Sequence, residues 1–280
     1  MNAYFRLMRL DKPVGIYLLL YPTLWALLLA AEGVPDLKLF LIFTLGVILM
    51  RSAGCVINDY ADRKIDKLIE RTSDRPITTG EIQPKSALIL FSILMAIAFG
   101  LVLMTNALTV QLALIAGFLA ILYPFTKRWT HLPQLVLGCA FAMSVPMVFA
   151  ATNGSVPNDA WWIFLATVVW TVVYDTMYAM ADREEDLKIG VKSSAILFAK
   201  FDRLIIAILQ LTLMVILLVI GSVFALKSEY FFMLVIVFGL MSYHQFLIKK
   251  REKNACFKAF VHNQYIGISV LFGIIFGVNY

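Results

Sequence analysis

Two short acidic stretches contain the side chains best suited to chemistry. The first runs from Asn58 to Asp66 and the second from Asp175 to Asp186. Residues three or four positions apart lie on one face of a helix. In the first stretch the residues that align are Asp59, Asp62 and Asp66, together with the pair Asn58 and Asp62, and in the second they are Asp175, Asp182 and Asp186.

Carboxylates lined up this closely repel one another, so the arrangement favours a bound cation. Ligands that are all oxygen indicate a hard cation such as Mg²⁺, which keeps several waters and shares its coordination with substrate phosphates. We therefore predict that the two acidic stretches together hold Mg²⁺. The alternative for each stretch alone is a solvated acidic helix end.

Basic residues follow both acidic stretches. Arg71 and Arg75 come after the first, and Lys188 and Lys192 come after the second. Arg suits bidentate contact with phosphate and Lys supplies a point charge. Carboxylates, a metal and these cations on one surface predict a site for a diphosphate.

The elements that position these residues are indicated by composition. The chain has 280 residues, of which 61% are hydrophobic and only 15% charged, whereas a soluble globular protein has about 25% charged residues. A helix needs about 20 apolar residues to cross a bilayer. The sequence predicts an all-α membrane protein with nine transmembrane helices, at about 14–31, 37–57, 87–105, 107–124, 133–152, 161–178, 204–226, 230–247 and 259–278.

The basic residues are sorted to one side of these predicted helices. Of the 24 Lys and Arg residues, 21 fall on connections that share one side, and only Lys38 and Lys227 fall on the other. Positive charge concentrates on cytoplasmic loops, so we expect a cytoplasmic N-terminus and both acidic stretches on the cytoplasmic side. This topology explains the net charge of +6 without nucleic-acid binding. The first apolar run is followed by others and no transit segment precedes it, which favours a bacterial plasma membrane.

Three further positions lie within or at the end of predicted membrane helices. Arg51 lies seven residues before Asn58, on the same helix face and two turns deeper. An ionisable residue inside the membrane indicates a site by default, and Asp175 is a second example. The run from Tyr123 to Arg128 ends the fourth predicted helix, where an aromatic belt with interfacial bases is an equally good explanation.

The pattern Asp-Arg-x-x-Asp occurs twice, at 62–66 and at 182–186. Four predicted helices separate the two copies, which places both on the same membrane side. This spacing indicates a parallel internal repeat with a site between the halves. We expect one domain over 1–280, with halves of about 1–130 and 131–280.

At this point the motifs resemble a known family. The chain is similar to the UbiA superfamily of intramembrane prenyltransferases in Asn58-Asp59-x-x-Asp62-x-x-x-Asp66, Arg71-Thr72-x-x-Arg75-Pro76, Tyr123-x-x-x-Lys127 and Asp175-x-x-Tyr178-Ala179-x-x-Asp182-x-x-x-Asp186. The segments 6–15, 21–25 and 186–193 are more narrowly similar to the 4-hydroxybenzoate polyprenyltransferases of ubiquinone biosynthesis.

The resemblance implies nine helices around a central cavity that opens laterally to lipid, with cytoplasmic cap loops at 59–86 and 182–203. Its substrates would be a polyprenyl diphosphate and a small aromatic acid, joined at the ring carbon ortho to the hydroxyl. No obligate protein partner is implied.

The resemblance also implies roles for individual residues. Mg²⁺ would be held by a set of five, which are Asn58, Asp62, Asp66, Asp182 and Asp186. Arg71, Arg75 and Lys192 would bind the diphosphate, and Tyr123 and Tyr178 would stabilise the allylic cation through their ring faces. Arg51 would hold the carboxylate of the acceptor, with Arg128 as the alternative. Asp175 would either help to remove the ring proton or orient Lys127.

Other interpretations stay open on the sequence alone. A superfamily member could prenylate a naphthoate, a homogentisate, a haem or a glycerol phosphate instead. A transporter could also use a buried Arg51 and Asp175 within an internal repeat. A transporter would place ionisable groups near the bilayer midplane, whereas nearly all the acids here lie at one face.

Overall fold

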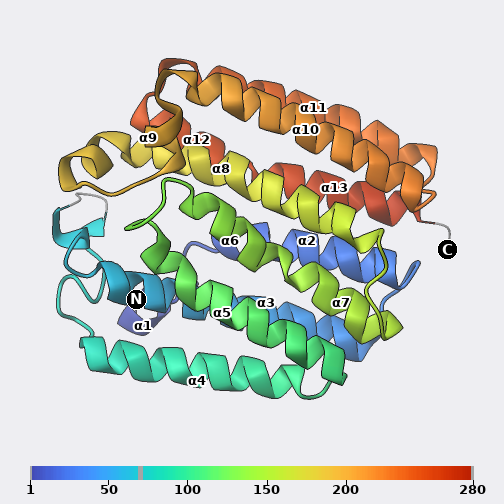
Figure 1. The fold of residues 1–280 in the computed structure, drawn as a ribbon, viewed down its shortest axis with the longest axis horizontal. Coiled ribbons are helices and arrows are strands. Elements are labelled where there is room, and N and C mark those ends of the chain that lie inside the picture. Colours follow the sequence, from blue (N-terminus) through green and yellow to red (C-terminus); the bar gives the residue numbers. More distant parts are fainter. Residues whose placement is uncertain (1, 69–71, 279–280) are drawn as a thin grey trace.

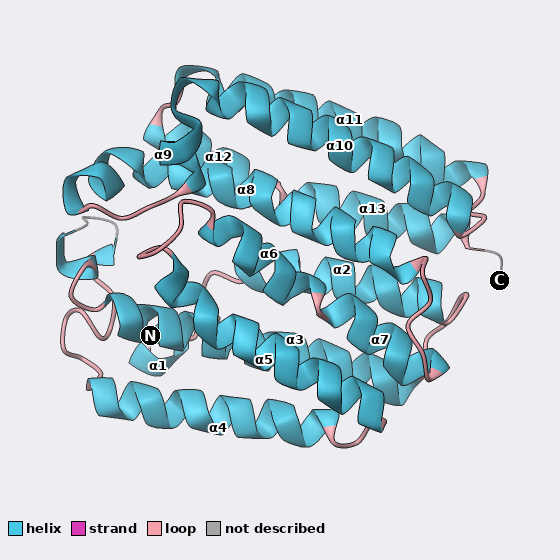
Figure 2. Cartoon of the chain, in the orientation of Figure 1, coloured by secondary structure: helices cyan, strands magenta, loops and turns pink. Residues whose placement is uncertain are grey.

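The chain folds into long helices that run alongside one another, as the computed structural model of residues 2–68 and 72–278 shows (Figure 1). Within these residues there is no strand (Figure 2). The long helices are α2 (Val14–Ala30), α3 (Leu37–Asp62), α4 (Pro84–Val102), α5 (Ala107–Thr126), α8 (Ala160–Ile189), α10 (Asp202–Val223) and α11 (Ser228–Leu247). Two further spans are each built from a pair, α6 (Pro133–Ala142) with α7 (Ser144–Asn153), and α12 (Lys253–His262) with α13 (Gln264–Gly277).

The predicted number of membrane helices is confirmed for the described residues. Eight spans are long and apolar enough to cross a bilayer, and α2 is a shorter apolar helix. Large apolar side chains point outward along the bundle, among them Phe118, Phe232 and Phe246. Exposed apolar patches of this extent do not occur on soluble monomers, so the surrounding solvent is lipid.

The fifth predicted span is not one straight helix. It breaks at Met143 between α6 and α7, because Pro146 cannot donate to the carbonyl oxygen of Ala142 and its ring crowds that oxygen. The ninth predicted span breaks at Asn263 for a different reason. The Asn263 side-chain amide donates to Ala259 O at 2.8 Å, and its backbone N–H turns to Phe260 O at 3.1 Å.

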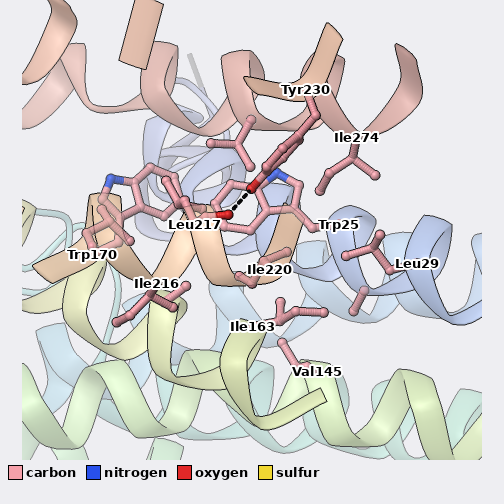
Figure 3. Packing of buried hydrophobic residues seen from close by; sticks show 14 of the residues in the cluster. Trp25, Leu29, Val145, Ile163, Trp170, Ile216, Leu217, Ile220, Tyr230 and Ile274 are labelled. Atoms are coloured by element: carbon pink, nitrogen blue, oxygen red, sulfur yellow. Dashed lines mark hydrogen bonds between the residues drawn. The ribbon is translucent and has the colours of Figure 1, made fainter. Parts of the chain in front are cut away.

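The core lies where α2, α8, α10, α11 and α13 meet. The indole rings of Trp25 and Trp170 stack with centroids 5.4 Å apart, and each indole N–H has an acceptor on the last span, Gly267 O or Asn263 Oδ1, at 3.1 Å. Tyr230 donates its hydroxyl to Leu217 O at 2.9 Å (Figure 3). Satisfied aromatic polar groups make this region rigid, which fixes α8, the helix that carries the second acidic stretch.

The end of the bundle that carries the N-terminus also gathers short elements, at the left of Figure 1. They are α1 (Ala3–Leu7), the 3₁₀ turn η1 (Asp66–Leu68), α9 (Ser194–Phe198), η3 (Ala199–Phe201) and η4 (Ile248–Lys250). α3, α5 and α8 all end there, and the C-terminal end of the described chain lies at the opposite end (Figure 1). The acidic stretches therefore lie at one end of the bundle.

The segment 182–203, expected as a loop, is mostly helical. α8 continues to Ile189 and ends at Gly190, which adopts the left-handed conformation with φ 73°. Gly190 is the first residue after Asp182 that favours a helix end, because the intervening residues are good helix formers. Asp182 and Asp186 are thus held on a rigid helix, and only 190–193 connects it to α9.

Candidate active site

One cavity of about 640 Å³ opens between α2, α3, α4, α5, α6, α7, α8 and α12, and its mouth lies at the end of the bundle where the acidic stretches are. Twelve of the fourteen residues predicted from the sequence line it. They are Arg51, Asn58, Asp62, Asp66, Arg75, Tyr123, Lys127, Asp175, Tyr178, Asp182, Asp186 and Lys192.

The two remaining predicted residues are placed differently. Arg128 is exposed and does not line the cavity; its guanidinium donates to Ala61 O at 3.1 Å and lies over the Phe125 ring. Arg71 lies outside the residues that the structure describes. Arg51 and Arg128 were alternatives on the sequence alone, and of the two only Arg51 lines the cavity.

The first acidic stretch supplies Asp62 and Asp66 at the mouth, and both are buried. Lys127, from the end of α5, donates to Asp62 Oδ2. The other oxygen, Asp62 Oδ1, is buried and has no hydrogen-bond partner among the described residues. Arg75 donates to Asp66 Oδ2 at 2.9 Å. Burial raises the pKa of Asp66 to about 6, with the nearby Asp59 and Asp62 adding to the effect and Arg75 opposing it.

Asp59 has a separate role, although it shares the helix face. Arg9 Nη2 donates to its two oxygens at 2.9 and 3.2 Å, and Arg75 Nη1 lies 2.9 Å from Asp59 Oδ1. Asp59 thereby ties the N-terminal segment and the turn after η1 to the end of α3. It fixes Arg75, which also contacts Asp66, at the mouth of the cavity.

A backbone contact brings the second acidic stretch to the first. Lys192 follows the end of α8, and its N–H donates to Lys127 O at 3.2 Å, while its ammonium donates to Trp129 O at 3.3 Å. Lys127 therefore joins Asp62 of α3 to the segment beside Asp182 and Asp186. Lys127 is 65 positions from Asp62 in the sequence and about as far from Lys192. Its contacts with both residues bring stretches that are far apart in sequence to one mouth.

Deeper in the cavity, Arg51 stands apart from the other bases. It makes no ion pair or hydrogen bond with any described residue, and its Nε is buried without a partner. The Phe141 ring lies beneath its guanidinium, 5.9 Å from Cζ to the ring centroid. A guanidinium in a membrane bundle that has no hydrogen-bond or ion-pair partner among the described residues is suited to bind an anionic group of a ligand.

Several lining residues were missed by the sequence reasoning. Arg9 was counted for topology and within the segment 6–15 but was given no role in the site, and Gln134 had no motif around it. Gln134 is buried at the start of α6, lines the cavity, and accepts a hydrogen bond from the Ser194 N–H at 3.2 Å. No signal in one sequence would have separated this Gln from any other polar residue at a helix start.

Three aromatic rings form one wall of the cavity, and the sequence predicted only one of them, Tyr178. Tyr178 packs edge-on against Phe260, with centroids 4.9 Å apart, and is 6.1 Å from Phe257. All three rings line the cavity. The two Phe residues come from α12, where the sequence offered only an apolar helix.

The donor set at the mouth fits Mg²⁺. Among the residues that the structure describes, no three His, Cys, Asp or Glu side chains converge to form a complete cage. Mg²⁺ sites do not need one, since the ion is usually held by one or two carboxylates, waters and substrate phosphates. The unpartnered Asp62 Oδ1 is a buried anionic oxygen that lacks a donor, as a metal ligand would.

Comparison with known proteins decides the family. The profile of the UbiA prenyltransferase family matches residues 19–269. The chain belongs to this family. It is an integral-membrane prenyltransferase, in agreement with its apolar helices.

Similar curated proteins cover the chain almost completely. It is 66% identical to a 4-hydroxybenzoate octaprenyltransferase of Vesicomyosocius okutanii, over 97% of this chain and 100% of that protein. It is 56% identical to a protein of the same name from Saccharophagus degradans, over 98% of this chain and 91% of that protein.

Solved structures of other UbiA homologues share the fold. An apo UbiA homologue from Aeropyrum pernix has a TM-score of 0.82 at 23% identity, covering 93% of this chain and 96% of its own. A UbiA homologue from Archaeoglobus fulgidus bound to GPP and Mg²⁺ has a TM-score of 0.75 at 20% identity, covering 98% and 99%. The predicted all-α fold of a UbiA prenyltransferase is confirmed.

Proposed function

We propose that this UbiA prenyltransferase transfers a polyprenyl group to the ring carbon ortho to the hydroxyl of 4-hydroxybenzoate, in ubiquinone biosynthesis. One observation carries the proposal: acidic side chains from α3 and α8 share a cavity mouth, and an unpartnered Arg51 lies deeper in the same cavity. The names of relatives at 66% and 56% identity support the same acceptor.

The diphosphate of the donor binds at the mouth. Arg75 and Lys192 face it there, and the family motif adds Arg71. Mg²⁺, held by Asn58, Asp62, Asp66, Asp182 and Asp186, supplies Lewis-acid neutralisation of the charge that develops on the leaving diphosphate. The bound GPP and Mg²⁺ of the Archaeoglobus fulgidus homologue support both parts of this assignment.

The polyprenyl tail extends from the mouth along the apolar part of the cavity. Side chains of α4 and α5, including Met95, Phe99 and Ala116, line this part. A cavity of about 640 Å³ is in the range that suits a compact small ligand. The far end of a long isoprenoid chain therefore continues between helices into lipid, where its apolar surface is already solvated.

The acceptor lies between the mouth and Arg51. Its carboxylate pairs with the Arg51 guanidinium, a charge-assisted contact that is strong in a site without bulk water. Its ring then lies among Tyr123, Tyr174 and Asp175, which line the cavity nearby. Arg128 is less suitable because it lies outside the cavity.

In the reaction, the bond between the allylic carbon and the diphosphate oxygen breaks, and its electron pair leaves with the diphosphate. The ring carbon ortho to the hydroxyl donates an electron pair to the allylic carbon and forms the new C–C bond. Asp175 accepts the proton that this ring carbon then loses. The faces of Tyr123 and Tyr178 stabilise the allylic cation, and Phe257 and Phe260 keep water away from it.

The site faces the cytoplasm of a bacterium, and the protein lies in its inner membrane. The basic residues gathered at the end of the bundle that holds the acidic stretches support this orientation. The cap expected at 59–86 and 182–203 includes the last two turns of α8, and its described residues Asp66, Arg75 and Lys192 line the cavity.

The test of this proposal is an acceptor panel in membranes that contain the full chain. One polyprenyl diphosphate is supplied with Mg²⁺ and with 4-hydroxybenzoate, a dihydroxynaphthoate or homogentisate, and the products are identified by mass spectrometry. We expect ring-prenylated 4-hydroxybenzoate as the main product. Faster prenylation of a different acceptor would overturn the assignment, and solute uptake into sealed vesicles without chemical change would indicate a transporter.

A further inference from the structure

Gly15, in the first turn of α2, lies directly against the guanidinium of Arg51. A Cβ built on Gly15 would lie 2.4 Å from Arg51 Nε, 2.5 Å from Nη2 and 2.8 Å from Cζ. Carbon and nitrogen atoms that are not bonded do not approach this closely. The absence of a side chain at position 15 therefore makes the room in which the Arg51 guanidinium lies.

The backbone gives no other reason for a glycine here. The glycines with positive φ are Gly33, Gly80, Gly154 and Gly190 among the described residues, so Gly15 has a conformation that any residue adopts. It lies inside a helix, where alanine is preferred over glycine. Local structure would favour alanine, and only the neighbouring guanidinium opposes it.

Two neighbours of the Arg51 guanidinium are thus known. Gly15 of α2 lies on one side, and the Phe141 ring of α6 lies 5.9 Å from Cζ. Arg51 Nε has no hydrogen-bond partner among the described residues. The Phe141 ring and the charge of Asp175 act on the group, but no hydrogen bond from a described residue holds it. A small change in the packing would therefore move it.

We propose that Gly15 is a positioning residue that sets the selectivity of this enzyme for a carboxylate-bearing acceptor, by seating the Arg51 guanidinium. The inference rests on the proposed function, in which Arg51 binds the acceptor carboxylate. Gly15 lines the cavity beside Arg51, and we infer that it acts through the position of Arg51 and not by contact with a substrate. It adds α2 to the elements that determine which acceptor is used.

Gly15→Ala should move the guanidinium and leave the fold intact. Restoring an ordinary contact of 3.4 Å requires a shift of about 1 Å, and the atoms that must move are the far end of a flexible side chain. A shift of this size misaligns a charge-assisted hydrogen bond to a carboxylate. We expect the KM for 4-hydroxybenzoate to rise roughly 10- to 100-fold, and the KM for the polyprenyl diphosphate to stay within about twofold because its binding groups are at the mouth.

The experiment measures kcat and KM for 4-hydroxybenzoate and for its uncharged analogue 4-hydroxybenzamide, in membranes with the full chain. The variants are Gly15→Ala, Arg51→Leu and the two combined, with Gly100→Ala as the matched control. Gly100 is an exposed helical glycine of α4 with open space around its Cβ position, and it does not line the cavity. The control should match the wild type.

Three results together support the inference. Gly15→Ala raises the KM for the acid, narrows the preference for acid over amide, and has no further effect once Arg51→Leu is present, since residues that act as a unit are not additive. If Gly15→Ala alone lowers the amount of folded protein, the combined variant should restore it, because leucine ends before the position of Nε.

Other results would overturn it. An unchanged KM in Gly15→Ala, an equal rise for both substrates, or an effect that adds fully to Arg51→Leu would each show that Gly15 does not act through Arg51. In those cases the wild type still prenylates 4-hydroxybenzoate, and the proposed function stands. A wild type that prenylates neither compound would overturn the proposed function and this inference with it.

Discussion

Asp59 and Asp62 lie on one face of α3 but differ in the partners of their carboxylate oxygens. Asp59 is held by Arg9 and Arg75, whereas Asp62 keeps one oxygen without a hydrogen-bond partner among the described residues. The helical spacing predicted one helix face for Asp59, Asp62 and Asp66, but α3 ends at Asp62 and Asp66 lies in η1. The spacing was therefore right only for Asp59 and Asp62. It could not separate the two roles, because Arg9 comes from 50 positions earlier and Arg75 from a turn beyond η1.

Arg51 shows what sequence can predict at the scale of one residue. Its depth and face were predicted from the seven-residue spacing, and Arg51 lines the cavity. The choice between Arg51 and Arg128 needed the structure, because both are bases near apolar helices. Arg128 donates to Ala61 O outside the cavity.

We predict that Arg51→Leu raises the KM for 4-hydroxybenzoate by roughly 100-fold, as expected for the loss of a charged hydrogen-bond partner. The KM for the polyprenyl diphosphate should change little. Steady-state kinetics with each substrate varied in turn measures both values, and Arg128→Leu serves as the comparison. A larger effect from Arg128→Leu, or an equal effect of Arg51→Leu on both substrates, would show that the carboxylate binds elsewhere.

At the scale of elements, the ends of α8 and α10 are joined by a buried ion-pair cluster. Asp202, at the start of α10, is fully buried. Arg183 Nη2 lies 2.6 Å from Asp202 Oδ2, and Arg251 Nη2 lies 2.8 Å from Oδ1. Arg183 follows Asp182 directly, so this cluster holds the end of α8 that presents the second acidic stretch.

The helices were more predictable than their ends. Length and apolar composition predicted every span, and the break at Met143 follows from Pro146 once the helix is known. The extension of α8 to Ile189 was missed, because charged residues after a membrane span look like a loop. The Asp202 cluster was missed as well, since its members are far apart in the chain and ordinary on a basic cytoplasmic surface.

Asp202→Ala should lower the thermal unfolding midpoint in detergent by roughly 5–10 °C. Removing one partner of a buried pair costs about 3–5 kcal/mol, because the two Arg charges lose their shared acceptor. Glu252→Ala is the matched control, since Glu252 and Lys250 are exposed and 4.0 Å apart, and such a pair contributes about 1 kcal/mol or less. Equal midpoints for the two variants would rule out the cluster as a stabilising element.

The whole molecule brings together two acidic stretches that start from distant parts of the chain. They share the pattern Asp-Arg-x-x-Asp at an offset of 120 residues, and both reach one cavity mouth. The sequence predicted that both lie on one membrane side, from spans and charge. The family resemblance predicted a central cavity. The sequence could not predict the walls of that cavity, which come from eight helices, or its volume, which depends on how their side chains pack.

The central claim is that carboxylates from α3 and α8 together enable Mg²⁺-dependent prenyl transfer to 4-hydroxybenzoate. The most direct test is the yield of ring-prenylated 4-hydroxybenzoate from membranes carrying the wild type, Asp62→Asn or Asp182→Asn, each with Mg²⁺ and with a chelator. Asp159→Asn is the control, since Asp159 is exposed and lies outside the cavity.

We expect the wild type and the Asp159→Asn control to form ring-prenylated 4-hydroxybenzoate only when Mg²⁺ is present. Each of the two variants should be folded in normal amounts and lose activity by roughly 100-fold or more, because a ligand of the Mg²⁺ that would neutralise the leaving diphosphate is removed. Substantial activity in either Asp62→Asn or Asp182→Asn, or an undiminished yield with the chelator, would contradict the central claim.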